Sequence, residues 1–291
     1  MWAVLIRLAI AALWCLRLLP LSLLAPLGGG LGWVAFHFWR ERRQICLANL
    51  EACFPDLTER ERRMLAKQHF AALSRSVLER GILWWSPGER VARVIRIVGA
   101  EHWQSAQKPV IFLVPHFVGL DAAATRLNME TEAVSIYSRQ KNPVVNELLV
   151  RYRTRFKPVI LLSRQDGALG VIRALRKGIP FYYLPDQDYG PRDSVFVPFF
   201  GVPTATITGV SRIARLTDAS VVPFVARMLP GGQGYEARFY PAWQNFPTDD
   251  LEADARRVNA FIEERVREMP EQYNWVHKRF KTRPPGEPGF Y

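Results

Sequence analysis

The sequence is poor in cysteine and in acidic residues. Its three cysteines, Cys15, Cys46 and Cys53, are an odd number without framework spacing in a chain of 291 residues. This argues against a disulfide-stapled secreted domain and favours a reducing compartment. Asp and Glu number 27 against 39 Lys and Arg, so the formal charge is +12. Such a charge predicts a polyanionic partner: nucleic acid, an anionic membrane or a phosphorylated substrate.

Charged residues are absent from one N-terminal stretch. Leu18–Trp39 contains no Lys, Arg, Asp or Glu, and the basic segment Arg40-Glu41-Arg42-Arg43 follows it. A run of this length can cross a bilayer, which favours membrane attachment over nucleic-acid binding. We therefore expect a retained membrane anchor over residues 1–43, a main domain over residues 44–291, and the basic side in the cytoplasm. Prolines and three consecutive glycines in the stretch leave open a kinked span or an interfacial helix.

No internal repeat interrupts the rest of the chain, in which strands and helices alternate. This alternation predicts an α/β domain with a mostly parallel central sheet flanked by helices. We expect strands at residues 94–98, 110–114, 133–137, 159–162, 181–184, 221–225 and 235–240. We expect helices at residues 58–85, after 121, at 143–155, up to 177, at 206–216 and at 250–269.

A histidine and a carboxylate follow the most apolar of these strands. Pro115 ends the run Val110–Val114, His116 comes next, and Asp121 begins a helix. Ligands of open α/β sheets bind beyond the carboxyl ends of the strands, so His116 and Asp121 suit a general base and its orienting partner. This spacing is common by chance, and a structural capping pair is the alternative. The buried strand that leads into the motif favours catalysis.

A second polar stretch also follows a strand, and its aspartates should reach the same crevice. Asp186-x-Asp188 is compatible with a divalent cation in a metal-dependent glycosyltransferase, or with ordinary loop aspartates in turns. The apolar part that follows, Val195–Phe200, is either core or the lining of an acyl channel.

Cationic residues gather at two further places. Arg151, Arg153 and Arg155 lie near a helix end, where guanidinium groups either bind an anionic substrate through paired hydrogen bonds or simply complement the helix dipole. The terminal stretch Tyr273–Arg283 interleaves aromatic and basic residues. It suits a membrane surface or lipid headgroup, although single-stranded nucleic acid is bound by the same residue types.

These motifs together resemble those of the bacterial lipid A biosynthesis acyltransferases, the lauroyl and myristoyl transferases that act late in endotoxin assembly and are related to the HxxxxD/E lysophospholipid acyltransferases. The Phe-Pro-Glu-Gly-Thr-Arg block of the wider glycerolipid acyltransferases is absent, which favours the lipid A branch. The resemblance covers the anchor, residues 49–55, the His-x4-acid pair, the loop at residues 185–192 with its continuation to 201, and residues 271–284.

The resemblance implies a glycerolipid acyltransferase-like fold and transfer of a fatty acyl group from acyl carrier protein. The acceptor would be a hydroxyl of a phosphorylated, Kdo-bearing lipid A precursor at the cytoplasmic face of the inner membrane, with no metal or organic cofactor and no nucleic acid. It assigns catalysis to His116 and Asp121, with Asp121 fixing the imidazole tautomer. Substrate binding falls on Arg153, or on Arg155 where the helix end aligns loosely, and on Asp186 and Arg192.

Other functions remain open from the sequence. The acceptor could be another anionic glycolipid or a lysophospholipid. A metal-dependent glycosyltransferase, a thioesterase and a non-catalytic lipid-binding protein are further alternatives. The acyl chain length and the acylated hydroxyl are not encoded in any motif.

Overall fold

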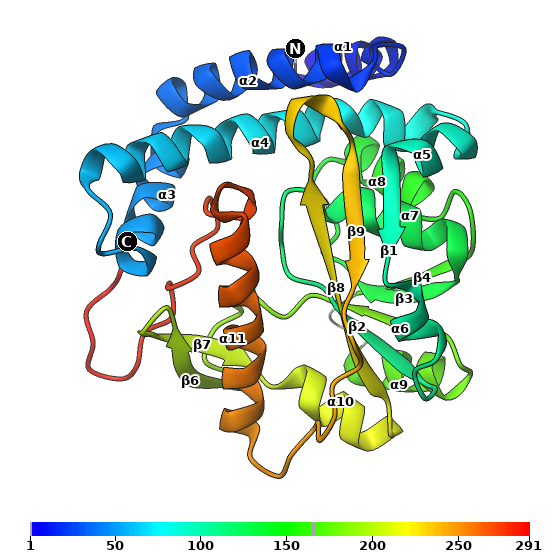
Figure 1. Cartoon of the computed structure of the whole chain (residues 1–291), viewed down its shortest axis with the longest axis vertical. Coiled ribbons are helices and arrows are strands. Elements are labelled where there is room, and N and C mark those ends of the chain that lie inside the picture. The colour runs from blue at the N-terminus through cyan, green and yellow to red at the C-terminus, as the bar shows by residue number, and fades with distance from the viewer. Residues whose placement is uncertain (1, 164–166) are drawn as a thin grey trace.

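The computed structural model describes residues 2–163 and 167–291, and its centre is a seven-stranded sheet (Figure 1). The strand order is β1-β9-β8-β2-β5-β3-β4. Among the described strands of this sheet, only β8 and β9 pair antiparallel, which confirms the predicted mostly parallel architecture. The strands are β1 (Ile95–Val98), β2 (Val110–Leu113), β3 (Ala133–Ile136), β4 (Val159–Leu162), β5 (Phe181–Tyr183), β8 (Ser220–Met228) and β9 (Tyr235–Phe239).

Helices cover both faces of this sheet, as expected for parallel strands joined by crossovers. Central strand β2 is buried along its whole length between β5 and β8. Its side chains alternate between two cores, with Ile111 on one face and Phe112 on the other. The helices are α1 (Trp2–Leu16), α2 (Leu21–Phe38), α3 (Arg40–Cys53), α4 (Glu59–Trp85), α5 (Gly88–Val94), α6 (Ala100–Gln104), α7 (Leu120–Glu130), α8 (Pro143–Arg153), α9 (Gly167–Arg176), α10 (Gly209–Thr217) and α11 (Leu251–Glu268).

A separate hairpin corrects one prediction. The helix predicted over residues 206–216 is wrong at its start, because β6 (Ser194–Phe199) pairs antiparallel with β7 (Val202–Ile207), and α10 begins only at Gly209. The β7 sequence is rich in β-branched residues, which favour a strand once a partner is available. Phe199 is buried in the core, so the apolar loop continuation is at least partly core.

The N-terminal helices lie along α4 rather than apart from the domain (Figure 1). Helix α4 starts with a capping box of Thr58 and Glu61. Two glycines of α2 make the contact close: a Cβ added at Gly28 would lie 2.6 Å from the Cα of Arg75, and one at Gly32 would lie 2.5 Å from the Cα of Ala71. Helix α2 therefore packs backbone against backbone on α4.

The terminal stretch is mostly interior. Tyr273, Trp275, Arg279 and Phe280 are each no more than 3% exposed. The prediction that these side chains contact a membrane surface or nucleic acid is therefore wrong, because they pack beneath the carboxyl edge of the sheet. The spacing of aromatic and cationic residues reflects a buried network, in which Arg279 donates to the carbonyl of Ala205 at 2.9 Å.

Candidate active site

Strands β2 and β5 are neighbours and deliver His116 and Asp186 to the same edge of the sheet. The backbone N–H of His116 donates to Oδ2 of Asp186 at 2.9 Å, and Nδ1 of His116 lies 2.7 Å from Oδ1. The Asp186 side chain is fully buried, whereas 13% of the His116 side chain is exposed. One buried carboxylate thus fixes both the backbone and the ring of His116.

These contacts define the protonation of the pair. Burial would raise the pKa of Asp186, but the charge and hydrogen bonds of His116 outweigh it and hold that pKa below its usual value. An ionised carboxylate only accepts hydrogen bonds, so Nδ1 of His116 carries the proton. The other nitrogen, Nε2, lies 3.1 Å from the side-chain nitrogen of Gln187, which only donates, so in the neutral ring Nε2 is the acceptor of this contact.

Asp121 has different partners from those predicted. Arg80 of α4 donates from Nε to Oδ2 of Asp121 at 2.8 Å, and Nη2 of Arg153 lies 4.0 Å from Oδ1. Although burial raises the pKa of Asp121, Arg80 and Arg153 hold it below its usual value, with a smaller contribution from His116. The prediction that Asp121 fixes the His116 tautomer is therefore wrong in this detail, because Asp186 occupies Nδ1. Asp121 instead forms an anionic centre between two arginines.

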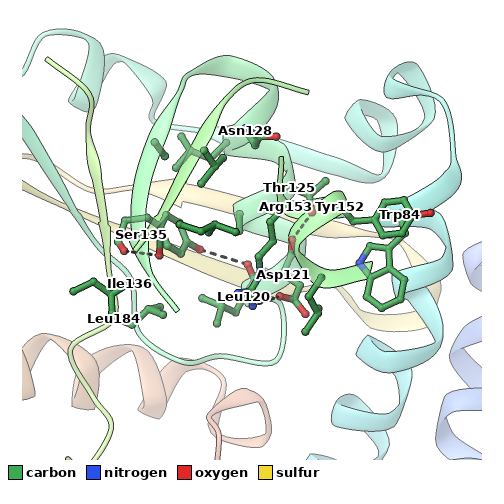
Figure 2. Close-up of a pocket in the computed structure, with 17 residues that line it drawn as sticks. Trp84, Leu120, Asp121, Thr125, Asn128, Ser135, Ile136, Tyr152, Arg153 and Leu184 are labelled. Carbon is green, nitrogen blue, oxygen red and sulfur yellow. Dashed lines mark hydrogen bonds and ion pairs between the residues drawn. The ribbon is translucent and has the colours of Figure 1, made fainter. Parts of the chain in front are cut away.

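A narrow cavity of about 90 Å³ opens beside Asp121 and Arg153 (Figure 2). It lies between helices α7 and α8 and the strands β3, β4 and β5, and most of its surface is apolar. It extends from Ile136 and Leu184 at the carboxyl edge to Ala133 and Val159 at the amino edge. The lining is Trp84, Leu120, Asp121, Ala124, Thr125, Leu127, Asn128, Ala133, Ser135, Ile136, Leu149, Tyr152, Arg153, Val159, Leu161, Tyr182 and Leu184.

A wider and more open hollow of about 610 Å³ adjoins this cavity. The two share Ile136, Tyr182 and Leu184, so they meet at the end of β5, next to Asp186. The hollow is also lined by Tyr189 and Arg192, and the Arg192 side chain is 94% exposed. The site therefore has a narrow apolar side and an open side that carries the ion pair of Arg192 and Asp193.

The remaining predicted residues have structural partners. Arg155 donates to the carbonyl oxygens of Leu83 and of Ser86, the latter at 2.6 Å, and so joins the ends of α8 and α4. This engagement argues against Arg155 as a substrate ligand. Asp188 accepts from the backbone and hydroxyl of Thr282 at 2.6 and 2.7 Å. In the described part of the chain, no three His, Cys, Asp or Glu side chains are grouped to hold a metal ion.

The C-terminal segment braces this site. Phe117 and Tyr273 form a β-bridge, in which the N–H of Asn274 donates to the carbonyl of His116 at 3.0 Å. The N–H of Asp188 donates to Nε2 of His277 at 3.1 Å. Burial, the largest effect, lowers the pKa of His277 to about 4, so this ring is neutral and can accept.

Arg80, Gln187 and His277 were not identified as site residues from the sequence. Gln187 and His277 lie within the two motifs that were singled out, so their positions carried a signal. Arg80 lies in the last third of the long helix α4 and carried none. Its role depends on the packing of α4 against α7, which no local pattern reveals.

Comparisons with known proteins give a consistent result. The family model described as "Bacterial lipid A biosynthesis acyltransferase" matches residues 2–282. The chain is 40% identical to the lipid A biosynthesis lauroyltransferase of Escherichia coli K12, over 98% of this chain and 94% of that protein. It is 33% identical to the myristoyltransferase of the same strain, over 96% and 88%, and 31% identical to its palmitoleoyltransferase, over 97% and 92%.

Proposed function

Since the chain belongs to the bacterial lipid A biosynthesis acyltransferases, we propose that it moves a fatty acyl chain from acyl carrier protein to a hydroxyl of a phosphorylated, Kdo-bearing lipid A precursor. Family membership makes it an O-acyltransferase of lipopolysaccharide biosynthesis. The observation that carries the proposed site is the pairing of His116 with buried Asp186, which follows β5 two residues after Leu184, a residue that lines both the apolar cavity and the open hollow.

The proposed chemistry uses His116 as general base. Nε2 takes the proton of the acceptor hydroxyl, and the oxygen attacks the thioester carbonyl carbon. When the carbon–sulfur bond breaks, the imidazolium returns the proton to the leaving thiolate. Asp186 stabilises the imidazolium through Nδ1, and the negative charge of Asp121 adds to that stabilisation from the other side of the site.

The two adjoining cavities suit the two substrates. The narrow cavity is lined mostly by apolar side chains, as an acyl chain requires, and we assign it to the part of the chain next to the thioester, which would lie beside Arg153 and Asp121. In the open hollow, exposed Arg192 lies 3.8 Å from Asp193, and we assign its guanidinium to the phosphate of the acceptor, since guanidinium groups bind phosphate through paired hydrogen bonds. The relatives are named for lauroyl, myristoyl and palmitoleoyl transfer, so family membership leaves the acyl length open.

Assays on the purified chain test this function. Wild type with acyl–acyl carrier protein and a lipid A precursor should give an acylated lipid by mass spectrometry, and well-folded His116→Ala should lose about 10²–10⁴-fold in rate. Free fatty acid as the main product would indicate a thioesterase. Acylation of a lysophospholipid in preference to the lipid A precursor would move the assignment to another anionic acceptor.

Membrane attachment through the N-terminal helices completes the proposal. Among the described helices, α2 is long and apolar enough to cross a bilayer. One of its faces is buried, through residues such as Leu24 and Phe36. The opposite face is an exposed apolar stripe of Leu23, Leu27, Leu31, Val34 and Phe38 at helical spacing.

This two-faced helix supports an attachment in the plane of the membrane. If α2 crossed the bilayer, it would have to separate from α4. In the structure, Gly28 and Gly32 of α2 pack closely against the backbone of α4. In the proposed arrangement, residues 1–43 lie on the cytoplasmic face of the inner membrane with the stripe in the lipid, and the catalytic domain follows. Fluorescent-protein fusions at both termini should then report the cytoplasm. A periplasmic N-terminus would show that α2 spans the bilayer.

A further inference from the structure

A chain of side-chain hydrogen bonds runs through both nitrogens of His116. Nδ1 contacts Asp186 at 2.7 Å, and Nε2 contacts the side-chain nitrogen of Gln187 at 3.1 Å. The hydroxyl of Tyr189 donates to the side-chain oxygen of Gln187 at 3.2 Å. Each contact constrains the next, so the orientation of the Gln187 amide can be deduced.

The contact of Asp186 with Nδ1 indicates the tautomer, and the contacts of Gln187 are compatible with it. The amide nitrogen of Gln187 faces His116, and the amide oxygen accepts from the Tyr189 hydroxyl. An amide nitrogen donates and does not accept, which makes Nε2 of His116 the acceptor. Asp186 at Nδ1 requires the same arrangement. The lone pair that a general base needs is therefore already occupied by an N–H of Gln187.

This occupied lone pair affects the competition between the acceptor and water. His116 is 13% exposed on its side chain, so water can approach it. A water on Nε2 would lose a proton to the imidazole while its oxygen bonds to the thioester carbonyl carbon. The carbon–sulfur bond would break, the thiolate would take the proton back, and free fatty acid would be released. The amide of Gln187 stands where that water would bind.

We propose that Gln187 is a positioning residue that keeps the His116 lone pair closed to water until the acceptor hydroxyl displaces its amide. It thereby sets the ratio of acyl transfer to thioester hydrolysis. Tyr189 links this closure to the acceptor, because it lines the open hollow as well as binding Gln187. The inference rests on the proposed function, in which His116 is the base.

The test compares the full-length wild type in detergent with Gln187→Ala and Gln187→Ala/His116→Ala. The control is Gln107→Ala, an exposed glutamine near the amino end of β2. Without acceptor, Gln187→Ala should hydrolyse acyl–acyl carrier protein about tenfold faster than wild type, as expected for removing one hydrogen-bonding competitor of water. The double variant should lose this excess, because His116 activates the water. The control should match wild type.

A second readout separates this role from a purely structural one. Diethyl pyrocarbonate modifies unprotonated imidazole, so His116 should react faster in Gln187→Ala than in wild type, as measured by peptide mass spectrometry. The proposal would be overturned if Gln187→Ala showed the wild-type rates of both thioester hydrolysis and His116 modification. It would also be overturned if the excess hydrolysis persisted in the double variant. Failure of the proposed function would look different, because wild type would then form no acylated lipid.

Discussion

Two carboxylates of the site, Asp186 and Asp121, interact electrostatically with His116 but have different partners. Asp186 is fully buried and contacts the ring directly, while 26% of the Asp121 side chain is exposed and its oxygens face Arg80 and Arg153. A buried carboxylate with a single ring partner suits tautomer control. A carboxylate between two arginines suits the orientation of those arginines toward a substrate. The linear spacing of His116 and Asp121 therefore identifies the site but not the pairing inside it.

Substitution of each carboxylate should separate these roles. Asp186→Asn removes the anion that fixes Nδ1–H, and we expect kcat to fall about 10³–10⁴-fold, since comparable histidine–aspartate units lose this much. Asp121→Asn should change KM for the acceptor more and kcat less. Steady-state kinetics on variants checked by circular dichroism measure both effects. A larger kcat loss for Asp121→Asn than for Asp186→Asn would restore Asp121 as the orienting partner.

The positions of many helices and strands could be predicted from the sequence. Which strands and side chains contact one another could often not be predicted. The strand at residues 159–162 and the helix after Thr58 match β4 and α4, because apolar runs and a capping box are local signals. The β6–β7 hairpin was missed because its strands are stable only through each other and α11. Asp186 contacts His116 because β5 lies next to β2 in the sheet. The two residues are 70 positions apart in the sequence, so no local pattern indicates this contact.

The deep end of the narrow cavity is formed by β3, β4 and α7. A larger side chain at this end should shorten the acyl chain that the enzyme prefers. Ala133 begins β3 and lines that end. We expect Ala133→Val to favour shorter donors, because each methylene that cannot be buried loses about 0.8 kcal/mol, or about fourfold in rate. Competition between acyl donors of different length measures this preference. Ala253→Val, exposed on α11, is the control. An unchanged preference would place the acyl chain elsewhere.

The contact between α4 and the terminal segment should make stability depend on pH. His69 on α4 is fully buried, and its Nδ1 lies 3.0 Å from the carbonyl of Glu271. Burial lowers the pKa of His69 to about 4, whereas an unfolded histidine titrates at about 6.5. As pH falls, the unfolded chain binds this proton first. The stabilisation is therefore full above about pH 6.5 and is lost toward pH 4.

We expect the titration of this histidine to remove about 2 kcal/mol of stability between about pH 7 and about pH 5. Thermal unfolding of wild type and His69→Gln, followed by circular dichroism across this range, measures it. The glutamine amide of the variant can still donate to the Glu271 carbonyl but does not titrate, so the variant's unfolding temperature should change less with pH. Equal slopes for both proteins would exclude His69 as a source of the effect.

On the scale of the whole molecule, the apolar stripe of α2 and the active site have to serve the same membrane-borne substrate. Helix α4 connects them, since it carries the α2 contact at Ala71 and Arg75 and the site residue Arg80. The exposed apolar residues of α1, such as Leu5 and Leu8, extend the stripe, and Arg40–Arg43 provides the basic flank. This arrangement suits a protein that works on an anionic lipid surface.

Charges placed in the stripe should therefore detach the protein without damaging its chemistry. Leu27 and Leu31 are 49% and 44% exposed and contribute little to the core. We expect Leu27→Glu/Leu31→Glu to lose most of its co-sedimentation with vesicles of phosphatidylethanolamine and phosphatidylglycerol, because burying unpaired carboxylates in lipid is unfavourable. Transfer to an acceptor in vesicles should fall in parallel, whereas transfer to a detergent-dispersed acceptor should stay near wild type. If the variant still sediments fully, the stripe is not the membrane contact; if both activities fall together, the helices support the site itself.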